Sequence, residues 1–251
     1  MSRHSRILAG LALAGLVVTS SAAHATPSAL FTWLFGGPLS CGQPVNDGWL
    51  EDHVSWTLDV AVTDLVEPYQ AYAATIEIVP QDGLAFPDAW RFDGAGCQAA
   101  VWDGFRYDPS PSESGCGSLV YGEGATIQSS SAVRTFDPQA NRLRLDLALA
   151  LEGPHQLAFP AAPYLVFRIP FNHAHSVLTL DTAPGNCGGR ERPVCVWLRS
   201  LRFQRADGSW YETARPLPVI AVNTPSVGGP SACASVPTRA STWGALKGSY
   251  R

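Results

Sequence analysis

Residues 87–102, PDAWRFDGAGCQAAVW, together with the residues that follow them, gather the side chains best suited to hold a ligand. Carbohydrate recognition needs flat apolar faces beside polar edges, and tryptophan, tyrosine and aspartate supply both. One interpretation is therefore a platform on which sugar rings stack, with carboxylates as hydrogen-bond acceptors. Its members would be Trp90, Trp102, Tyr107, Asp88, Asp93 and Asp103.

The same segment has a structural interpretation, which we favour. Trp90 and Phe92 would close the end of a sandwich, because tryptophan is highly buried on average. Arg91 would pair with a carboxylate, the glycines between Phe92 and Cys97 would permit a turn, and Cys97 would fix that turn with a disulfide.

Enzymatic chemistry has weaker support in the sequence. A glycan hydrolase would need two carboxylates roughly 5 to 9.5 Å apart across a cleft. The candidates are Asp88, Asp93, Asp103, Asp108 and Glu123. No GxSxG motif indicates a serine hydrolase, and oxidised cysteines cannot act as nucleophiles. We expect no catalytic residues and no cofactor, and keep a glycan-active hydrolase as the alternative.

Metal binding is the least supported chemistry. His173 and His175 are two residues apart, so on a strand they would point to one face. Zinc or copper would need a third ligand such as His53 or Asp146, and no spacing in the sequence indicates one. We therefore predict no metal site.

The first 25 residues have the pattern of a secretory signal peptide. Arg3 and Arg6 precede an apolar run over residues 7–18, and small residues follow it. We predict export to the periplasm or the extracellular space. No later apolar run is long enough for a membrane helix.

Net charge argues against nucleic acid as a partner. Removing residues 1–25 takes away two of the 17 basic residues and none of the 21 acidic ones, so the mature chain has a formal charge of 15 − 21 = −6. An acidic surface repels phosphate backbones.

Six cysteines follow the leader, and an even number in an oxidising compartment indicates three disulfides. Sequence alone leaves roughly 15 connectivities open. Closure of the shortest loops favours Cys97 with Cys116 and Cys187 with Cys195, which leaves Cys41 with Cys233.

Alternating apolar and polar residues predict many β-strands. In RLRLDLALAL, for example, five leucines at every second position would face a core, whereas a helix would scatter them. Asp207-Gly208 is a hairpin turn signal. The predicted strands span residues 54–62, 72–78, 118–122, 142–151, 164–169, 176–180, 194–204, 209–213 and 217–222.

These strands predict an all-β fold: an antiparallel two-sheet β-sandwich, stapled by disulfides. We place the sandwich domain at residues 41–225, after a lead-in at 26–40. Residues 226–251 are a linker and a short C-terminal tail. The ending TWGALKGSYR is similar to C-termini of exported bacterial proteins, so this tail either docks or is processed, or is simply a frayed terminus.

The stretch LDVAVTDLVEPYQAYAATIEIVPQDGLAF resembles the first two strands of cohesin-like and carbohydrate-binding sandwiches. The residues that carry the resemblance in the second strand are Ala71, Tyr72, Ile76 and Ile78, followed by Leu84. The Tyr-Asp-Pro of cohesin-like domains occurs here only later, at residues 107–109, so dockerin binding is not carried over. The resemblance implies a jelly-roll-like sandwich employed in binding or scaffolding.

We therefore predict a secreted, non-catalytic β-sandwich for extracellular binding or surface display. The leading ligand class is a polysaccharide or another cell-surface polymer. A structural component of a secreted or surface assembly is a further alternative to the hydrolase.

Overall fold

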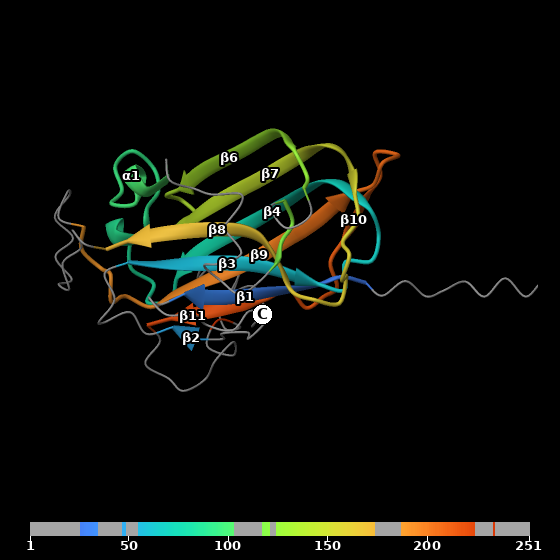
Figure 1. Cartoon of the computed structure of the whole chain (residues 1–251). Coiled ribbons are helices and arrows are strands. Elements are labelled where there is room, and N and C mark those ends of the chain that lie inside the picture. Colours follow the sequence, from blue (N-terminus) through green and yellow to red (C-terminus); the bar gives the residue numbers. More distant parts are fainter. Residues whose placement is uncertain are drawn as a thin grey trace, which may run out of the picture.

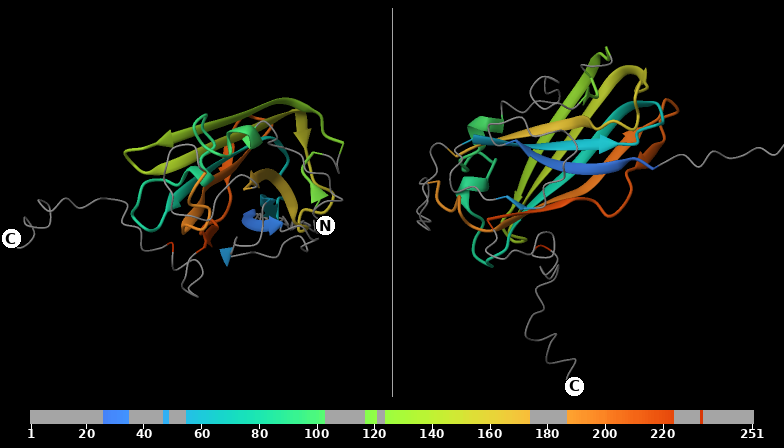
Figure 2. Two further views of the ribbon diagram at one scale, coloured as in Figure 1. Left: turned by 90° about the vertical axis from the view of Figure 1, so that its left-hand side faces the viewer. Right: turned by 60° about the horizontal axis from the view of Figure 1, so that its bottom comes forward.

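Two β-sheets face each other in the computed structural model of the chain (Figures 1 and 2). The structure describes residues 26–34, 47–48, 55–102, 117–120, 124–173, 187–223 and 233. Strands make up most of these residues, and the helical elements are one turn each, η1 (Asp88–Trp90) and α1 (Ala99–Trp102). The predicted two-sheet β-sandwich is confirmed.

The smaller sheet has four strands in the order β1-β3-β8-β5. They are β1 (Ser28–Leu34), β3 (Ser55–Thr63), β8 (Tyr164–Asn172) and β5 (Gly117–Ser118). The larger sheet has the order β2-β11-β9-β4-β7-β6, with β10 also paired to β9. Its strands are β2 (Asp47–Gly48), β11 (Val219–Val222), β9 (Val194–Gln204), β4 (Tyr69–Pro80), β7 (Arg142–His155), β6 (Ile127–Asp137) and β10 (Trp210–Glu212).

The long strand pairs are antiparallel, as predicted. Two short pairs are parallel: β5 with β8 and β2 with β11. Each of these two-residue strands adds to the end of its sheet, so the deviation from an antiparallel sandwich is confined to the margins.

The core lies between the sheets and follows the alternation of the sequence. The β7 leucines at 143, 145, 147, 149 and 151 are buried, whereas Arg142 and Arg144 between them are exposed. Ile76 and Ile78 on β4 lie opposite Leu145 and Leu143 in the register, on the same buried face. Burial of such one-sided apolar faces is the main stabilising term of a sandwich.

Seven of the nine predicted strands coincide with observed strands, and the predicted strand 118–122 corresponds to the shorter β5. Residues 176–180 lie outside the described part. The Asp207-Gly208 turn joins β9 to β10, and Gly208 has a φ of 85°. The sequence analysis missed β6, and it assigned β1 to a lead-in although β1 pairs with β3 over its whole length.

The predicted disulfide pairing is wrong. Cys97 pairs with Cys187 and Cys195 pairs with Cys233, at Cα–Cα distances of 5.5 and 5.8 Å. The favoured pairs Cys97–Cys116, Cys187–Cys195 and Cys41–Cys233 are therefore excluded. Cys187 does not pair with Cys195, because Cys195 lies inside β9 and Cys187 lies in the loop before it, beside the 87–98 turn.

Cys41 and Cys116 lie outside the described residues, and none of the cysteines in the described part is free. Cys233, from the predicted linker, packs with Cys195 and Ala221 in a small cluster of buried residues. Within the described residues, no helix is long and apolar enough to span a membrane.

Candidate functional site

A hollow of about 550 Å³ opens at the end of the sandwich where β4 ends and β9 begins. It lies between the β4–η1 connection (83–88), the β6–β7 turn (138–141) and the loop before β9 (188–192). Ligand sites commonly occupy roughly 300 to 1,000 Å³, so the hollow is large enough for a small molecule or one unit of a polymer.

Part of the wall is apolar. Phe86 and Phe136 contact each other edge to face, with ring centroids 5.4 Å apart. Leu84 stands at the mouth with 53% of its area exposed. Exposed leucines of this kind are uncommon in the described part of the chain, where the large exposed hydrophobic side chains are Leu84, Ile127, Val133, Phe159 and Trp210.

Arg91 forms one polar wall and is held on three sides. Its guanidinium donates to both carboxylate oxygens of Asp93 at 2.8 and 2.5 Å and to Asp88 at 2.9 Å. The guanidinium carbon also lies 4.5 Å from the centroid of the Phe136 ring. The hydrogen bonds from Arg91 lower the pKa of Asp93, although burial opposes them.

Arg192 forms the other polar wall and is nearly inaccessible, with 2% of its side chain exposed. It donates to both oxygens of Asp82 at 2.6 Å and to the carbonyl of Ala85 at 2.6 Å. Burial acts to raise the pKa of Asp82, but the hydrogen bonds from Arg192 and from the Leu84 amide outweigh it and the pKa is lowered.

Close backbone contacts shape the loop before β9. Gly189 has a φ of +85°, and a Cβ built on it would lie 2.7 Å from the Cβ of Pro87. Only glycine fits this position, since any side chain would be strained and would push the loop away from Pro87. The Cys97–Cys187 disulfide fixes the same loop to the 87–98 turn.

The structure supports the structural interpretation of Trp90 and not the stacking platform. Trp90 is fully buried, and its ring lies 5.6 Å from those of Phe171 and His173. A sugar ring cannot stack on an indole that has no exposed face. Gly96 permits the turn as expected, because a Cβ there would lie 2.3 Å from the carbonyl oxygen of Arg91.

The other predicted ligand residues are dispersed. Asp88 lines the hollow, and Asp93 reaches it only through Arg91. Trp102 is partly buried against Phe92, with ring centroids 5.5 Å apart. Asp103 and Tyr107 lie outside the described residues, as do Asp108 and Glu123.

His173 is buried beneath Trp90 in a polar contact with Gln98. The Gln98 side chain donates to the carbonyl of Ala89 at 2.7 Å and accepts from the amide of Asn172 at 2.8 Å. Burial, with a smaller contribution from the charge of Arg190, lowers the pKa of His173 to about 3. The described residues contain no group of three or more metal-ligating side chains; His53 and His175 lie outside them.

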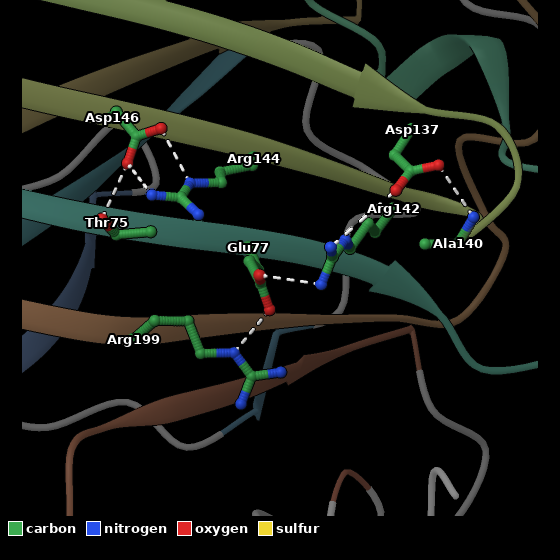
Figure 3. A network of polar contacts seen from close by, with 8 residues as sticks. All are labelled: Thr75, Glu77, Asp137, Ala140, Arg142, Arg144, Asp146 and Arg199. Carbon is green, nitrogen blue, oxygen red and sulfur yellow. Dashed lines mark hydrogen bonds and ion pairs between the residues drawn. The ribbon is translucent and has the colours of Figure 1, made fainter. Parts of the chain in front are cut away.

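Ion pairs also cross the outer face of the large sheet (Figure 3). Glu77 on β4 accepts from Arg142 on β7 at 3.3 Å and from Arg199 on β9 at 2.6 Å. On the same face Asp146 accepts from Arg144 at 2.7 and 2.8 Å and from Thr75 at 2.8 Å. Glu77 and Asp146 therefore each face a guanidinium across or along the strands, which makes these contacts a structural network.

Sequence analysis missed most of the hollow. Of the residues that line the hollow, the sequence predicts only Asp88 as a ligand residue. Arg192 and Asp82 are 110 residues apart, so no local spacing reveals their pairing. The one local signal was the polar and glycine-rich character of both loops, QDG and GGRER.

No family model and no curated protein matches the chain. Among solved structures the chain is similar to a cohesin module of a family 33 glycoside hydrolase from Clostridium perfringens, with 7% identity, a TM-score of 0.32, and coverage of 79% of this chain and 98% of that one. It is likewise similar to a type II cohesin domain from the cellulosome of Acetivibrio cellulolyticus, with 9% identity, a TM-score of 0.32, and coverage of 79% and 96%.

Proposed function

We propose that the protein is an exported, non-catalytic binding module and that the hollow at the end of its sandwich holds the ligand. The leading ligand is a sugar unit of a polysaccharide or of another cell-surface polymer. The observation that carries the proposal is the hollow itself, about 550 Å³ with apolar and polar walls that are held rigid by arginine–carboxylate pairs.

The polar groups of the hollow suit a hydroxylated ligand. The Oδ1 oxygen of Asp88 accepts a hydrogen bond from Arg91. Its Oδ2 oxygen accepts no hydrogen bond from the part of the chain that the structure describes. This second oxygen is available to a sugar hydroxyl, and Leu84 at the mouth offers an apolar contact for the face of the ring. Preformed polar groups in a largely apolar hollow fix the orientation of a ligand.

Two carboxylates that pair with the arginines of the hollow are poor candidates for the acid of a hydrolase. A glycosidase acid must carry a proton near neutral pH, which requires a raised pKa. Asp82 and Asp93 instead have lowered pKa values because arginine hydrogen bonds stabilise their charged forms. The hydrolase alternative would thus need a proton donor other than Asp82 and Asp93.

Export is supported by the leader pattern and by two disulfides, since disulfides persist in oxidising compartments. Cys97–Cys187 joins two loops, and Cys195–Cys233 ties residue 233 to β9. A rigid module of this kind suits extracellular binding or display, where no cellular reductant is present.

The experiment is affinity electrophoresis of the mature protein in gels containing a panel of polysaccharides. We expect retardation by at least one of them and about tenfold weaker affinity, ~1.4 kcal/mol, for Leu84→Gln. The matched control is Val133→Gln, because Val133 is also 53% exposed but lies on β6 away from the hollow. Unchanged migration in every gel would remove the proposal, and release of reducing sugar would favour the hydrolase.

A further inference from the structure

We infer that β6 is a strand-addition edge that pairs with β6 of a second copy of this chain, so that the two large sheets become continuous. This inference is independent of the ligand in the hollow. It starts from the topology: β6 is the last strand of its sheet, bonded to β7 on one side, and no described strand lies on its other side (Figure 1).

The edge is long and accessible. β6 has eleven residues and is the longest strand at a sheet margin, since β1 has seven and β2 and β5 have two each. Residues 127–131 are exposed at every position, not at every second one. Both faces of this half of the strand are therefore open to solvent, and a partner strand meets no steric barrier from the residues that the structure describes.

Apart from a register shift between Ile127 and Ser129, β6 also lacks the features that normally protect an edge. Exposed edge strands usually carry proline, lysine or a central charge that blocks pairing with another chain. β6 contains no proline or lysine, and its charged residues, Arg134 and Asp137, lie in its C-terminal half. The guanidinium of Arg134 lies 5.7 Å from the Trp102 ring and 3.5 Å from the carbonyl of Ala99, so it is directed at the protein's own surface.

A second copy is the occupant that the sequence of β6 fits. In an antiparallel pairing centred on Ser131, Val133 lies opposite Ser129, and Arg134 lies opposite Gln128. No like charges face each other, which would destabilise the pair. The side chains at the centre, serine and alanine, are small enough for close approach. Two identical strands related by a two-fold axis form a closed, self-complementary interface.

The distribution of charge also favours this edge as the contact between two copies of the chain. The mature chain carries a formal charge of −6, so two copies repel each other over most of their surface. Residues 127–136 carry no acidic residue and a single arginine. Copies can therefore approach along this segment without opposing carboxylates.

The test is the concentration dependence of the mass of the full mature protein, followed by sedimentation equilibrium. We expect twice the chain mass at high concentration for the natural sequence. Ser131→Glu and Ser131→Lys should each be monomeric, because each variant places its new charge opposite the same charge in its copy. An equimolar mixture of the two variants should regain the dimer.

Matched controls distinguish the loss of β6 pairing from a general effect of an added charge. Gln139→Glu and Gln139→Lys place the same charges on the exposed β6–β7 turn, outside the paired segment, and should dimerise like the natural sequence. A natural protein that is monomeric at every concentration overturns the inference.

Discussion

Arg192 and Asp82 form a two-pronged ion pair with both contacts at 2.6 Å, and this pair joins the loop after β4 to the loop before β9. The two loops make up opposite walls of the hollow. Arg192 is almost completely buried by them and also donates to the Ala85 carbonyl. Because residues of both loops bury Arg192, the shape of the hollow depends on this ion pair.

Arg192→Ala is predicted to lower the free energy of unfolding by ~2–3 kcal/mol. The substitution removes a side chain that is only 2% exposed, so it leaves a cavity, and it also removes the hydrogen bonds from Arg192 to Asp82 and Ala85. The control is Arg142→Ala, because Arg142 is 44% exposed in its pairs with Glu77 and Asp137. Exposed pairs contribute about 0–1 kcal/mol. Urea unfolding of both variants measures the difference, and equal losses of unfolding free energy would contradict a larger contribution from Arg192.

Trp90→Ala is predicted to lower the free energy of unfolding by ~3–5 kcal/mol, because truncation of a fully buried tryptophan leaves a cavity. Trp210→Ala should change it by less than about 1 kcal/mol, since this side chain is 40% exposed. The measurement is urea unfolding followed by circular dichroism. A small effect of Trp90→Ala on the free energy of unfolding would instead favour the interpretation of Trp90 as part of a stacking platform for sugars.

The core of the fold was predictable because its pattern is local. Leu143, Leu145 and Leu147 alternate with polar residues, and only a strand with one buried face satisfies that pattern. β6 has no such pattern, since residues 127–131 are exposed on both faces and are mostly serine. The sequence signal for a strand disappears where the strand does not bury a face.

The site was not predictable because its contacts are distant in sequence. Trp90 was correctly favoured as a buried residue from the general behaviour of tryptophan, whereas Arg192 meets Asp82 only once β4 and β9 have paired. Disulfide pairing failed for the same reason. Cys97 and Cys187 are 90 residues apart in sequence, and the sheets bring them together.

Acid is predicted to destabilise the protein through His173. Its pKa is about 3 in the folded protein, against an ordinary value near 6.5. Below about pH 6.5 the unfolded chain binds a proton that the folded one does not, so the free energy of unfolding falls by up to ~1.4 kcal/mol per pH unit. This loss continues to about pH 3 and is complete once the folded protein is also protonated.

His173→Gln should flatten the dependence of stability on pH between 6.5 and 4.5, where the carboxylates contribute little. Urea unfolding at pH 7.5, 5.5 and 4.5 measures the slope for the natural protein and the variant. The slopes should converge only below about pH 3, where the folded protein also binds the proton at His173. Asp82 and Asp93, whose pKa values are lowered in the folded state, add a loss of stability in acid that the natural protein and the variant share. A slope that His173→Gln does not change would assign the acid sensitivity to other groups.

The third disulfide is predicted to join Cys41 and Cys116. Four of the six cysteines are used by the pairs Cys97–Cys187 and Cys195–Cys233, and an exported chain with an even number of cysteines is expected to have all of them oxidised.

Peptide mapping of the unreduced mature protein by mass spectrometry should therefore find one peptide pair containing Cys41 and Cys116, together with the two observed pairs. Thiol titration of the unfolded, unreduced protein should find no free thiol. Two titratable thiols, with the other pairs intact, would show that Cys41 and Cys116 are reduced. On the loop-entropy relation a 75-residue closure contributes ~4 kcal/mol, so Cys41→Ser with Cys116→Ser should lower the urea midpoint markedly if the bond is present.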